Sequence, residues 1–87
     1  MPNLVWTPTA WKDYLYWHEQ DKRKVRRTND LITSALRDPF AGEGKPEPLR
    51  FQLAGCWSRR IDQEHRLVYA WDEKATTLTI LQCLYHY

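Results

Sequence analysis

The stretch WSRRIDQEHRLVYAW at residues 57–71 contains two strand-like runs separated by a polar turn. Trp57–Ile61 and His65–Trp71 are rich in aromatic and β-branched residues, which are favoured in β-strands. The turn between them, Asp62-Gln63-Glu64, is short enough to reverse the chain directly. The stretch therefore predicts an antiparallel hairpin, and with it an antiparallel sheet.

Three further runs are strand candidates. Thr77–Tyr87 follows a second polar turn, Asp72-Glu73-Lys74, and Leu49–Leu53 lies before the hairpin. A short apolar run, Leu4-Val5-Trp6, lies near the N-terminus. Because side chains alternate between the two faces of a strand, the last run is expected to place one set of residues on a common face: Leu78, Ile80, Gln82, Leu84 and His86.

Two helices are predicted between the first strand candidate and residue 38. Thr7 and Pro8 are typical of an N-cap and a first helical position. Apolar and aromatic residues then recur at helical spacing at Trp11, Tyr14, Leu15 and His18, with Tyr16 and Trp17 widening that face. Asp21 can cap a second helix, whose inner stripe is Val25, Thr28, Ile32, Ala35 and Leu36. Asp38-Pro39 ends this helix, because the residue before a proline disfavours the helical conformation.

The predicted order is β-α-α-β-β-β, which is an α+β fold. An N-terminal strand is followed by an antiparallel two-helix hairpin that packs on one face of an antiparallel β-sheet. The other face of the sheet is left open for a ligand. With 87 residues, the chain is expected to form a single domain over residues 1–87.

Composition narrows the class of protein. The longest uncharged run, Ala75–Tyr87, is too short to span a bilayer, and the N-terminus lacks the features of a signal peptide. Cys56 and Cys83 are too few for a disulfide scaffold or a four-cysteine zinc site. We expect a cytoplasmic protein with two free thiols that serve as small apolar groups.

The net charge of +2 is modest, but residues 21–27, DKRKVRR, carry a local +4. Such a basic block suggests a polyanion as a partner. Other signals are weak: the run Gly42-Glu43-Gly44-Lys45 lacks the serine or threonine of a phosphate-binding loop. His18, His65 and His86 have no metal-ligand spacing, and no cofactor or metal is expected.

The second half of the chain contains most of the polar residues that could take part in catalysis or phosphate binding: Lys45, Glu47, Arg50, Arg59, Arg60, Arg66 and His86. One interpretation is a solvated sheet face with scattered ion pairs. However, antiparallel pairing would bring the ends of three strands together, so that Arg60, Arg66 and His86 converge at one end of the sheet.

These residue types match the needs of metal-free RNA cleavage. The reaction requires a base for the 2′-hydroxyl, positive charge for the phosphorane oxygens and an acid for the departing 5′-oxygen. Glu47 can act as the base, Arg66 with Arg50 or Arg60 can supply the charge, and His86 can act as the acid. Two tyrosines near the end of the chain, Tyr85 and Tyr87, could stack on a base.

The chain resembles the YoeB toxins, which belong to the RelE-like superfamily of bacterial ribosome-dependent mRNA interferases. The resemblance extends from Trp6 to Tyr87 and is carried by DYLYW at 13–17, DKR at 21–23, DPF at 38–40, GKPEPL at 44–49, WSRRI at 57–61, EHRLVYA at 64–70 and YHY at 85–87. It implies a two-helix layer on an antiparallel sheet.

The resemblance also implies roles for individual residues. Glu47 would be the general base, His86 the general acid, and Arg66 the residue that stabilises the phosphate in the transition state. The remaining candidates are expected to bind RNA or its phosphates: Lys45, Arg50, Arg60 and Tyr87. Arg50 stands where the family often has lysine, which keeps the charge but changes the donor geometry.

Partners and localisation are further implications of the resemblance. A YoeB-like toxin would cut mRNA in the A site of the bacterial 70S ribosome and inhibit translation. A cognate YefM-like antitoxin would silence it, and operator DNA would be contacted only through that antitoxin. A homodimer is expected in the cytoplasm, with no membrane association, and an aromatic excess on the first helix, at Tyr14 and Trp17, fits either a dimer or an antitoxin contact.

Several alternatives stay open at this point. The chain could instead be a non-catalytic module that binds the ribosome or an antitoxin; a DNA-binding protein is disfavoured because there is no recognition-helix signature. The basic block at 22–27 could be a solvated helix face or could bind ribosomal RNA. His65 could be catalytic, but a structural role is favoured because it starts a strand and has the opposite parity to Arg66.

Overall fold

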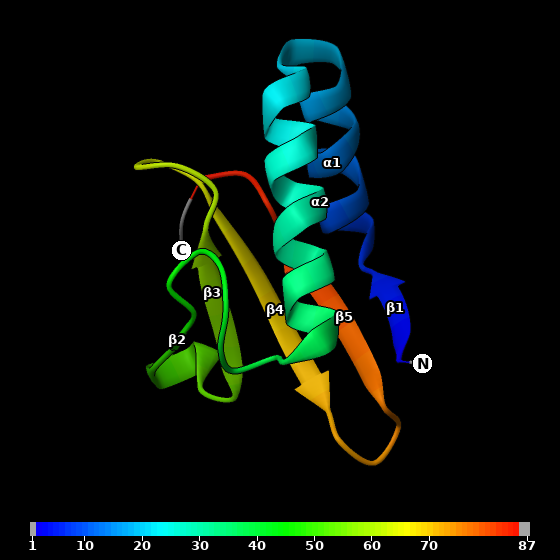
Figure 1. Cartoon of the computed structure of the whole chain (residues 1–87), viewed down its shortest axis with the longest axis vertical. Coiled ribbons are helices and arrows are strands. Elements are labelled where there is room, and N and C mark those ends of the chain that lie inside the picture. Colours follow the sequence, from blue (N-terminus) through cyan, green and yellow to red (C-terminus); the bar gives the residue numbers. More distant parts are fainter. Residues whose placement is uncertain (1, 86–87) are drawn as a thin grey trace.

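A five-stranded sheet with two helices packed against it forms the core of the protein, in a computed structural model that describes residues 2–85 (Figure 1). The two helices run side by side in opposite directions. The elements in chain order are β1 (Asn3–Trp6), α1 (Pro8–Gln20), α2 (Lys22–Arg37), β2 (Glu47–Pro48), a 3-10 helix η1 (Phe51–Leu53), β3 (Cys56–Arg60), β4 (Arg66–Asp72) and β5 (Thr77–Gln82).

The sheet is mixed, with the strand order β1-β5-β4-β3-β2. The hairpins β3–β4 and β4–β5 are antiparallel, as the polar turns predicted, but β1 pairs in parallel with β5. The predicted α+β class is confirmed, whereas a wholly antiparallel sheet is wrong at this edge. Turns determine only how consecutive strands pair, and β1 and β5 are separated by all the other elements.

Two strand predictions also change in detail. Leu49–Leu53 is not a strand: the strand is the shorter Glu47–Pro48, and Phe51 has a left-handed φ of 58°, which interrupts extended backbone. β5 ends at Gln82, and a bulge shifts its register so that Tyr69 pairs with Ile80 while Val68 pairs with Gln82. Since Val68 and Tyr69 lie on opposite faces of β4, the bulge puts Ile80 and Gln82 on opposite faces as well.

The helices begin where the capping residues predicted. The Thr7 hydroxyl accepts a hydrogen bond from the Ala10 N–H, and the Asp21 carboxylate accepts one from the Arg23 N–H. Of the predicted stripe, α2 buries Val25, Thr28, Ile32 and Ala35, together with Leu31, whereas Leu36 is only partly buried.

The inner face of α1 differs from the prediction, because its buried residues are Ala10 and Trp17. Trp11, Leu15 and Tyr16 are instead between 44% and 48% exposed. Trp17 is therefore not available for a partner, and the exposed aromatic surface of α1 lies elsewhere on the helix. In residues 2–85 no helix combines the length and apolar character that crossing a membrane would need.

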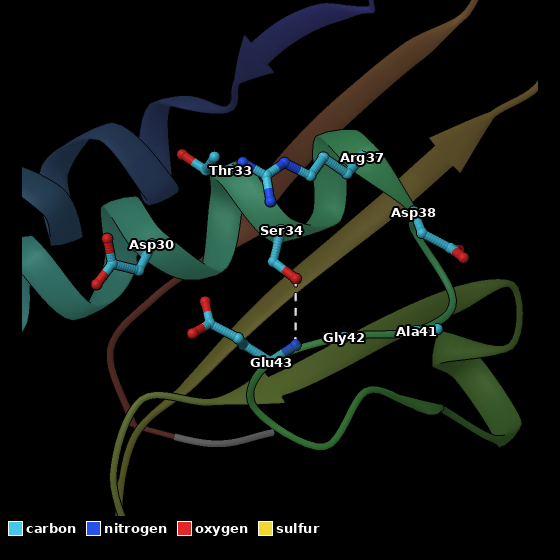
Figure 2. Close-up of a pocket in the computed structure, with 8 residues that line it drawn as sticks. All are labelled: Asp30, Thr33, Ser34, Arg37, Asp38, Ala41, Gly42 and Glu43. Atoms are coloured by element: carbon cyan, nitrogen blue, oxygen red, sulfur yellow. Dashed lines mark hydrogen bonds between the residues drawn. The ribbon is translucent and has the colours of Figure 1, made fainter.

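A buried arginine, Arg59 on β3, fixes the loop between α2 and β2. Its side chain is fully buried and donates five hydrogen bonds, to the Tyr69 hydroxyl, the Ser34 hydroxyl and the carbonyl oxygens of Asp38, Ala41 and Glu43. The Glu43 N–H also donates to the Ser34 hydroxyl over 3.1 Å (Figure 2). The loop lies close against α2, since a Cβ on Gly42 would collide with the Ser34 Oγ. Arg59 thus ties this loop to the sheet and to α2.

We expect the substitution Arg59→Met to lower the free energy of unfolding by about 3 kcal/mol or more, because five buried or partly buried hydrogen bonds would be lost. Urea unfolding followed by tryptophan fluorescence measures this loss. Arg60→Met, at the exposed neighbouring position, is the matched control and should change stability by less than about 0.5 kcal/mol. Similar losses in both variants would contradict the structural role of Arg59.

Candidate functional site

Glu47 and Arg66 meet on the face of the sheet that is turned away from the helices. Leu67 and Tyr69 belong to the helix-facing core, so Arg66 points to the opposite side of β4. Its Nη1 donates to the Glu47 Oε1 over 2.9 Å and lies 3.5 Å from the Ser58 Oγ. The Glu47 side chain is half exposed, so this ion pair is open to solvent and to a ligand. The two residues that the sequence predicted as base and phosphate-binding group are therefore in direct contact.

Arg60 lies next to this pair at the end of β3. It is the cross-strand partner of Arg66, and because directly opposed residues share a face, both side chains belong to the open side of the sheet. The Arg60 N–H donates to the Gly44 carbonyl over 2.7 Å, which brings the exposed Lys45 backbone alongside. The Arg60 carbonyl accepts a hydrogen bond from the Arg27 Nη2, which links α2 to the same corner. A second arginine thus lies beside Arg66 on the face that carries the ion pair.

Arg50 lines the same hollow as Glu47, which is formed by residues 47–53. The neighbouring Leu49 is buried and anchors this segment to the protein. Phe51 was not singled out by the sequence, yet it is 86% exposed and lines the same hollow as Glu47. An exposed aromatic ring at this position is suited to stacking on a nucleobase. A lone phenylalanine directly after the basic Arg50 was the only available signal for it.

The chain after β5 turns back onto α1 and the start of β4. The Cys83 N–H donates to the Asp13 Oδ2 over 3.1 Å, and the Trp17 Nε1 donates to the Cys83 carbonyl over 2.7 Å. The Arg66 N–H donates to the Tyr85 carbonyl over 2.8 Å, so residue 85 lies beside the candidate site. His86 and Tyr87 lie outside the described residues, and their predicted positions next to Arg66 stay predictions.

His65 has the buried environment that a structural role requires. Its Nδ1 accepts a hydrogen bond from the Tyr85 N–H over 2.6 Å, and its ring contacts the Trp17 ring edge-on at a centroid distance of 4.7 Å. The Asp62 Oδ1 accepts hydrogen bonds from the backbone N–H groups of Glu64 and His65. These contacts fit the structural interpretation favoured from the sequence, and they also connect His65 to the end of the described chain.

Burial and charge shift the pKa values of three groups around this segment. Burial raises the pKa of Asp13, and the hydrogen bond from the Cys83 N–H and the charge of Lys12 offset only part of that effect. Burial and the charge of Asp13 together raise the pKa of Cys83 to about 12. Burial alone would raise the pKa of Asp62, but hydrogen bonds from Lys24 and from two backbone N–H groups outweigh it and lower the pKa.

A family model described as the YoeB-like toxin of bacterial type II toxin–antitoxin systems matches residues 6–87. The chain belongs to the YoeB toxin family. The toxin YoeB of Escherichia coli K12 is 55% identical over 84 residues, which cover 97% of this chain and 98% of that protein. A YoeB/ParE toxin from Agrobacterium tumefaciens superposes with a TM-score of 0.94 at 52% identity, covering 98% of this chain and 99% of its own. The RelE-like fold expected from the sequence is thereby confirmed.

Two structures from Staphylococcus aureus show YoeB proteins in assemblies. A YoeB dimer has a TM-score of 0.89 at 42% identity and covers 99% of this chain and 98% of its own. A YoeB–YefM complex has a TM-score of 0.88 at 41% identity and covers 100% of this chain and 99% of its own. YoeB relatives have therefore been crystallised both as a dimer and with the antitoxin YefM.

The raised pKa of Cys83 predicts a slow reaction with iodoacetamide. With a pKa of about 12 the Cys83 thiol is almost wholly protonated at pH 8, and its side chain is fully buried. In the variant Cys56→Ser we expect Cys83 to be alkylated at least about tenfold more slowly than Cys56 in the matched variant Cys83→Ser, because Cys56 is only half-buried. Mass spectrometry of timed samples measures both rates. Equal rates would show that the segment around Cys83 is not docked as described.

Proposed function

We propose that this protein is a ribosome-dependent endoribonuclease of a type II toxin–antitoxin system, which cleaves mRNA in the ribosomal A site and so inhibits translation. The observation that carries the proposal is the solvent-accessible contact between Glu47 and Arg66, with Arg60 as the cross-strand neighbour of Arg66. A base and a phosphate-binding group side by side are what transesterification of RNA needs. Membership of the YoeB family supports the same function.

The proposed reaction starts when Arg66 exchanges its hydrogen-bond partner, from Glu47 to a phosphate of the substrate. In the free protein its guanidinium binds Glu47. A substrate phosphate would compete for this guanidinium, because Arg binds phosphate through charge-assisted hydrogen bonds. Glu47 would then be free to accept the proton of the 2′-hydroxyl group. In this way the arrival of substrate activates the base.

The 2′-oxygen then attacks the adjacent phosphorus atom, and the bond from phosphorus to the 5′-oxygen breaks. Arg66 stabilises the negative charge on the phosphorane oxygens, with Arg60, Arg50 and Lys45 contributing to phosphate binding. His86 donates a proton to the departing 5′-oxygen, and Tyr87 orients the nucleotide. The products are a 2′,3′-cyclic phosphate and a free 5′-hydroxyl, and no metal or cofactor takes part.

The proposed partners are the bacterial 70S ribosome with its mRNA, a YefM-like antitoxin and a second copy of this chain, all in the cytoplasm. Operator DNA would be contacted only through the antitoxin. The S. aureus dimer and YoeB–YefM complex support the two protein partners. Trp11, Leu15 and Tyr16 on α1 offer exposed apolar surface for one of these contacts.

The basic N-terminal part of α2 is proposed to bind ribosomal RNA. Some of its charge is already used: Lys24 pairs with Asp62 over 2.7 Å, and Arg23 pairs with Asp21 over 3.2 Å. Lys22 and Arg26 are exposed. Because Arg27 reaches the Arg60 carbonyl, this helix and the candidate site share one corner of the molecule, where a single RNA surface could contact both.

Cleavage on the ribosome tests the catalytic proposal. With mRNA on a bacterial 70S ribosome whose A site is empty, we expect the parent protein to cut within the A-site codon. Glu47→Ala and His86→Ala should each reduce the single-turnover rate by about 100-fold or more, because each removes a proton-transfer group. Primer extension locates and quantifies the cut.

Glu43→Ala is the matched control for this experiment, since Glu43 is an exposed acid in the same loop whose structural contacts are made by its backbone. It should cut like the parent. If folded, ribosome-bound parent protein makes no cut, the alternative of a non-catalytic module that binds the ribosome or an antitoxin is correct.

The salt dependence of ribosome binding tests the role of α2. Replacing Lys22, Arg23, Arg26 and Arg27 with glutamine should make the plot of log affinity against log salt shallower, by about one unit for each RNA phosphate that the variant no longer neutralises. The variant Arg37→Gln/Lys74→Gln removes charge from the C-terminal end of α2 and from the turn between β4 and β5, and it should leave the slope unchanged. An unchanged slope in the fourfold variant would exclude the N-terminal part of α2 as an RNA-binding surface.

A further inference from the structure

Three side chains from distant parts of the sequence dock the segment that follows β5. Asp13 accepts the Cys83 N–H, Trp17 donates to the Cys83 carbonyl and His65 accepts the Tyr85 N–H. The backbone of residues 83–85 is thus held by hydrogen bonds at both ends. This stretch carries the chain from the end of β5 to Tyr85, directly before the candidate acid His86.

Tyr85 needs this docking because its backbone is in the left-handed region, with a φ of 58°. A residue with a Cβ adopts that conformation only where its surroundings enforce it. Here two hydrogen bonds do so: the Tyr85 N–H donates to the His65 Nδ1, and the Tyr85 carbonyl accepts from the Arg66 N–H. His65, just before β4, and Arg66, the first residue of β4, thus bind the backbone N–H and the carbonyl of Tyr85.

The His65 ring is itself fixed from several sides. It is 8% exposed and lies between Trp17 and Tyr85, whose ring centroids are 4.7 and 5.0 Å away. Its backbone N–H donates to the Asp62 carboxylate, which pairs with Lys24 on α2. Because Nδ1 accepts a hydrogen bond, the ring proton belongs on Nε2, which lies 3.6 Å from the Glu64 carboxylate. The acceptor nitrogen is therefore aimed at the Tyr85 N–H.

We propose that His65 is a positioning residue for the cleavage reaction, which acts by holding the left-handed turn at Tyr85 and thereby setting where the chain delivers His86. The inference rests on the proposed function, since it assumes that His86 is the acid. It gives the imidazole a role that its buried ring alone would not require. An apolar ring of similar size could fill the same space, but it could not accept the Tyr85 N–H.

Two substitutions separate the acceptor from the ring. His65→Phe keeps an aromatic ring between Trp17 and Tyr85 but removes the acceptor. His65→Asn removes the ring but places an amide oxygen close to the position of Nδ1. Gln63→Ala, at an exposed position in the same turn, is the control.

We expect the rate of cleavage on the ribosome to depend on whether residue 65 can accept the hydrogen bond from the Tyr85 N–H. His65→Phe should lower the single-turnover rate at saturating protein by about tenfold or more while ribosome affinity stays within about twofold, because misplacing a proton donor affects the chemical step. His65→Asn should retain more activity than His65→Phe despite a lower melting temperature. If activity instead follows melting temperature across the two variants, His65 is only structural and the proposal is wrong.

Amide hydrogen exchange at Tyr85, measured by NMR, tests the docking without using activity. His65→Phe should speed exchange of the Tyr85 N–H by about tenfold or more, while Gln63→Ala should leave it unchanged. Unchanged exchange in His65→Phe would overturn the positioning role even if the parent cuts mRNA. If the Tyr85 exchange responds as expected but the parent makes no cut, it is the proposed function that fails, and the docking of the terminal segment by His65 stands.

Discussion

The five hydrogen bonds of the buried Arg59 guanidinium hold together the α2–β2 loop, the sheet and α2, and the arrangement of this molecule depends on them. Burying a charged group away from water destabilises the folded state unless its hydrogen bonds are satisfied. Arg59 donates five hydrogen bonds, all to uncharged oxygen atoms. Three of these oxygens are carbonyls of the loop that joins α2 to β2. The Tyr69 hydroxyl, which binds Arg59, donates in turn to the Pro39 carbonyl. The loop is therefore folded around one side chain.

The position of Glu47 follows from this constraint. The loop leads directly into β2, which is only two residues long and could not by itself fix the direction in which the chain arrives. With the loop fastened by Arg59 and Leu49 buried just after β2, Glu47 is restrained on both sides. It is then paired opposite Ser58 on β3, on the face where Arg66 can reach it. A buried cation on one face of the sheet thus organises the exposed ion pair on the other.

Local signals in the sequence predicted the local parts of this structure. The caps at Thr7 and Asp21 and the turns between β3, β4 and β5 depend on a few neighbouring residues, so their chemistry is legible in the sequence. The parallel pairing of β1 and the bulge in β5 depend on packing between distant segments, and no short pattern encodes them.

The same distinction applies to the candidate site. Antiparallel pairing through the turn at 62–64 predicted that Arg60 and Arg66 would be neighbours, whereas the contact with Glu47 depends on a loop whose course the sequence did not reveal. The sequence already contained the information that Arg59 and Arg60 face opposite sides of the sheet. Adjacent residues of a strand face opposite sides, and Arg59 pairs with the buried Leu67. Parity alone therefore indicated that one arginine would be inside and the other outside.

Arg66 connects the two halves of the proposed chemistry through different atoms. Its guanidinium binds Glu47, while its backbone N–H binds the Tyr85 carbonyl, next to the end of the described chain. The side chain can leave Glu47 for a phosphate without disturbing the backbone contact, because the β4 ladder holds the main chain in place. An exchange of partners at the base is therefore compatible with a fixed terminal segment. In the proposed mechanism, this separation would let the Arg66 side chain bind substrate while its backbone keeps the terminal segment in place.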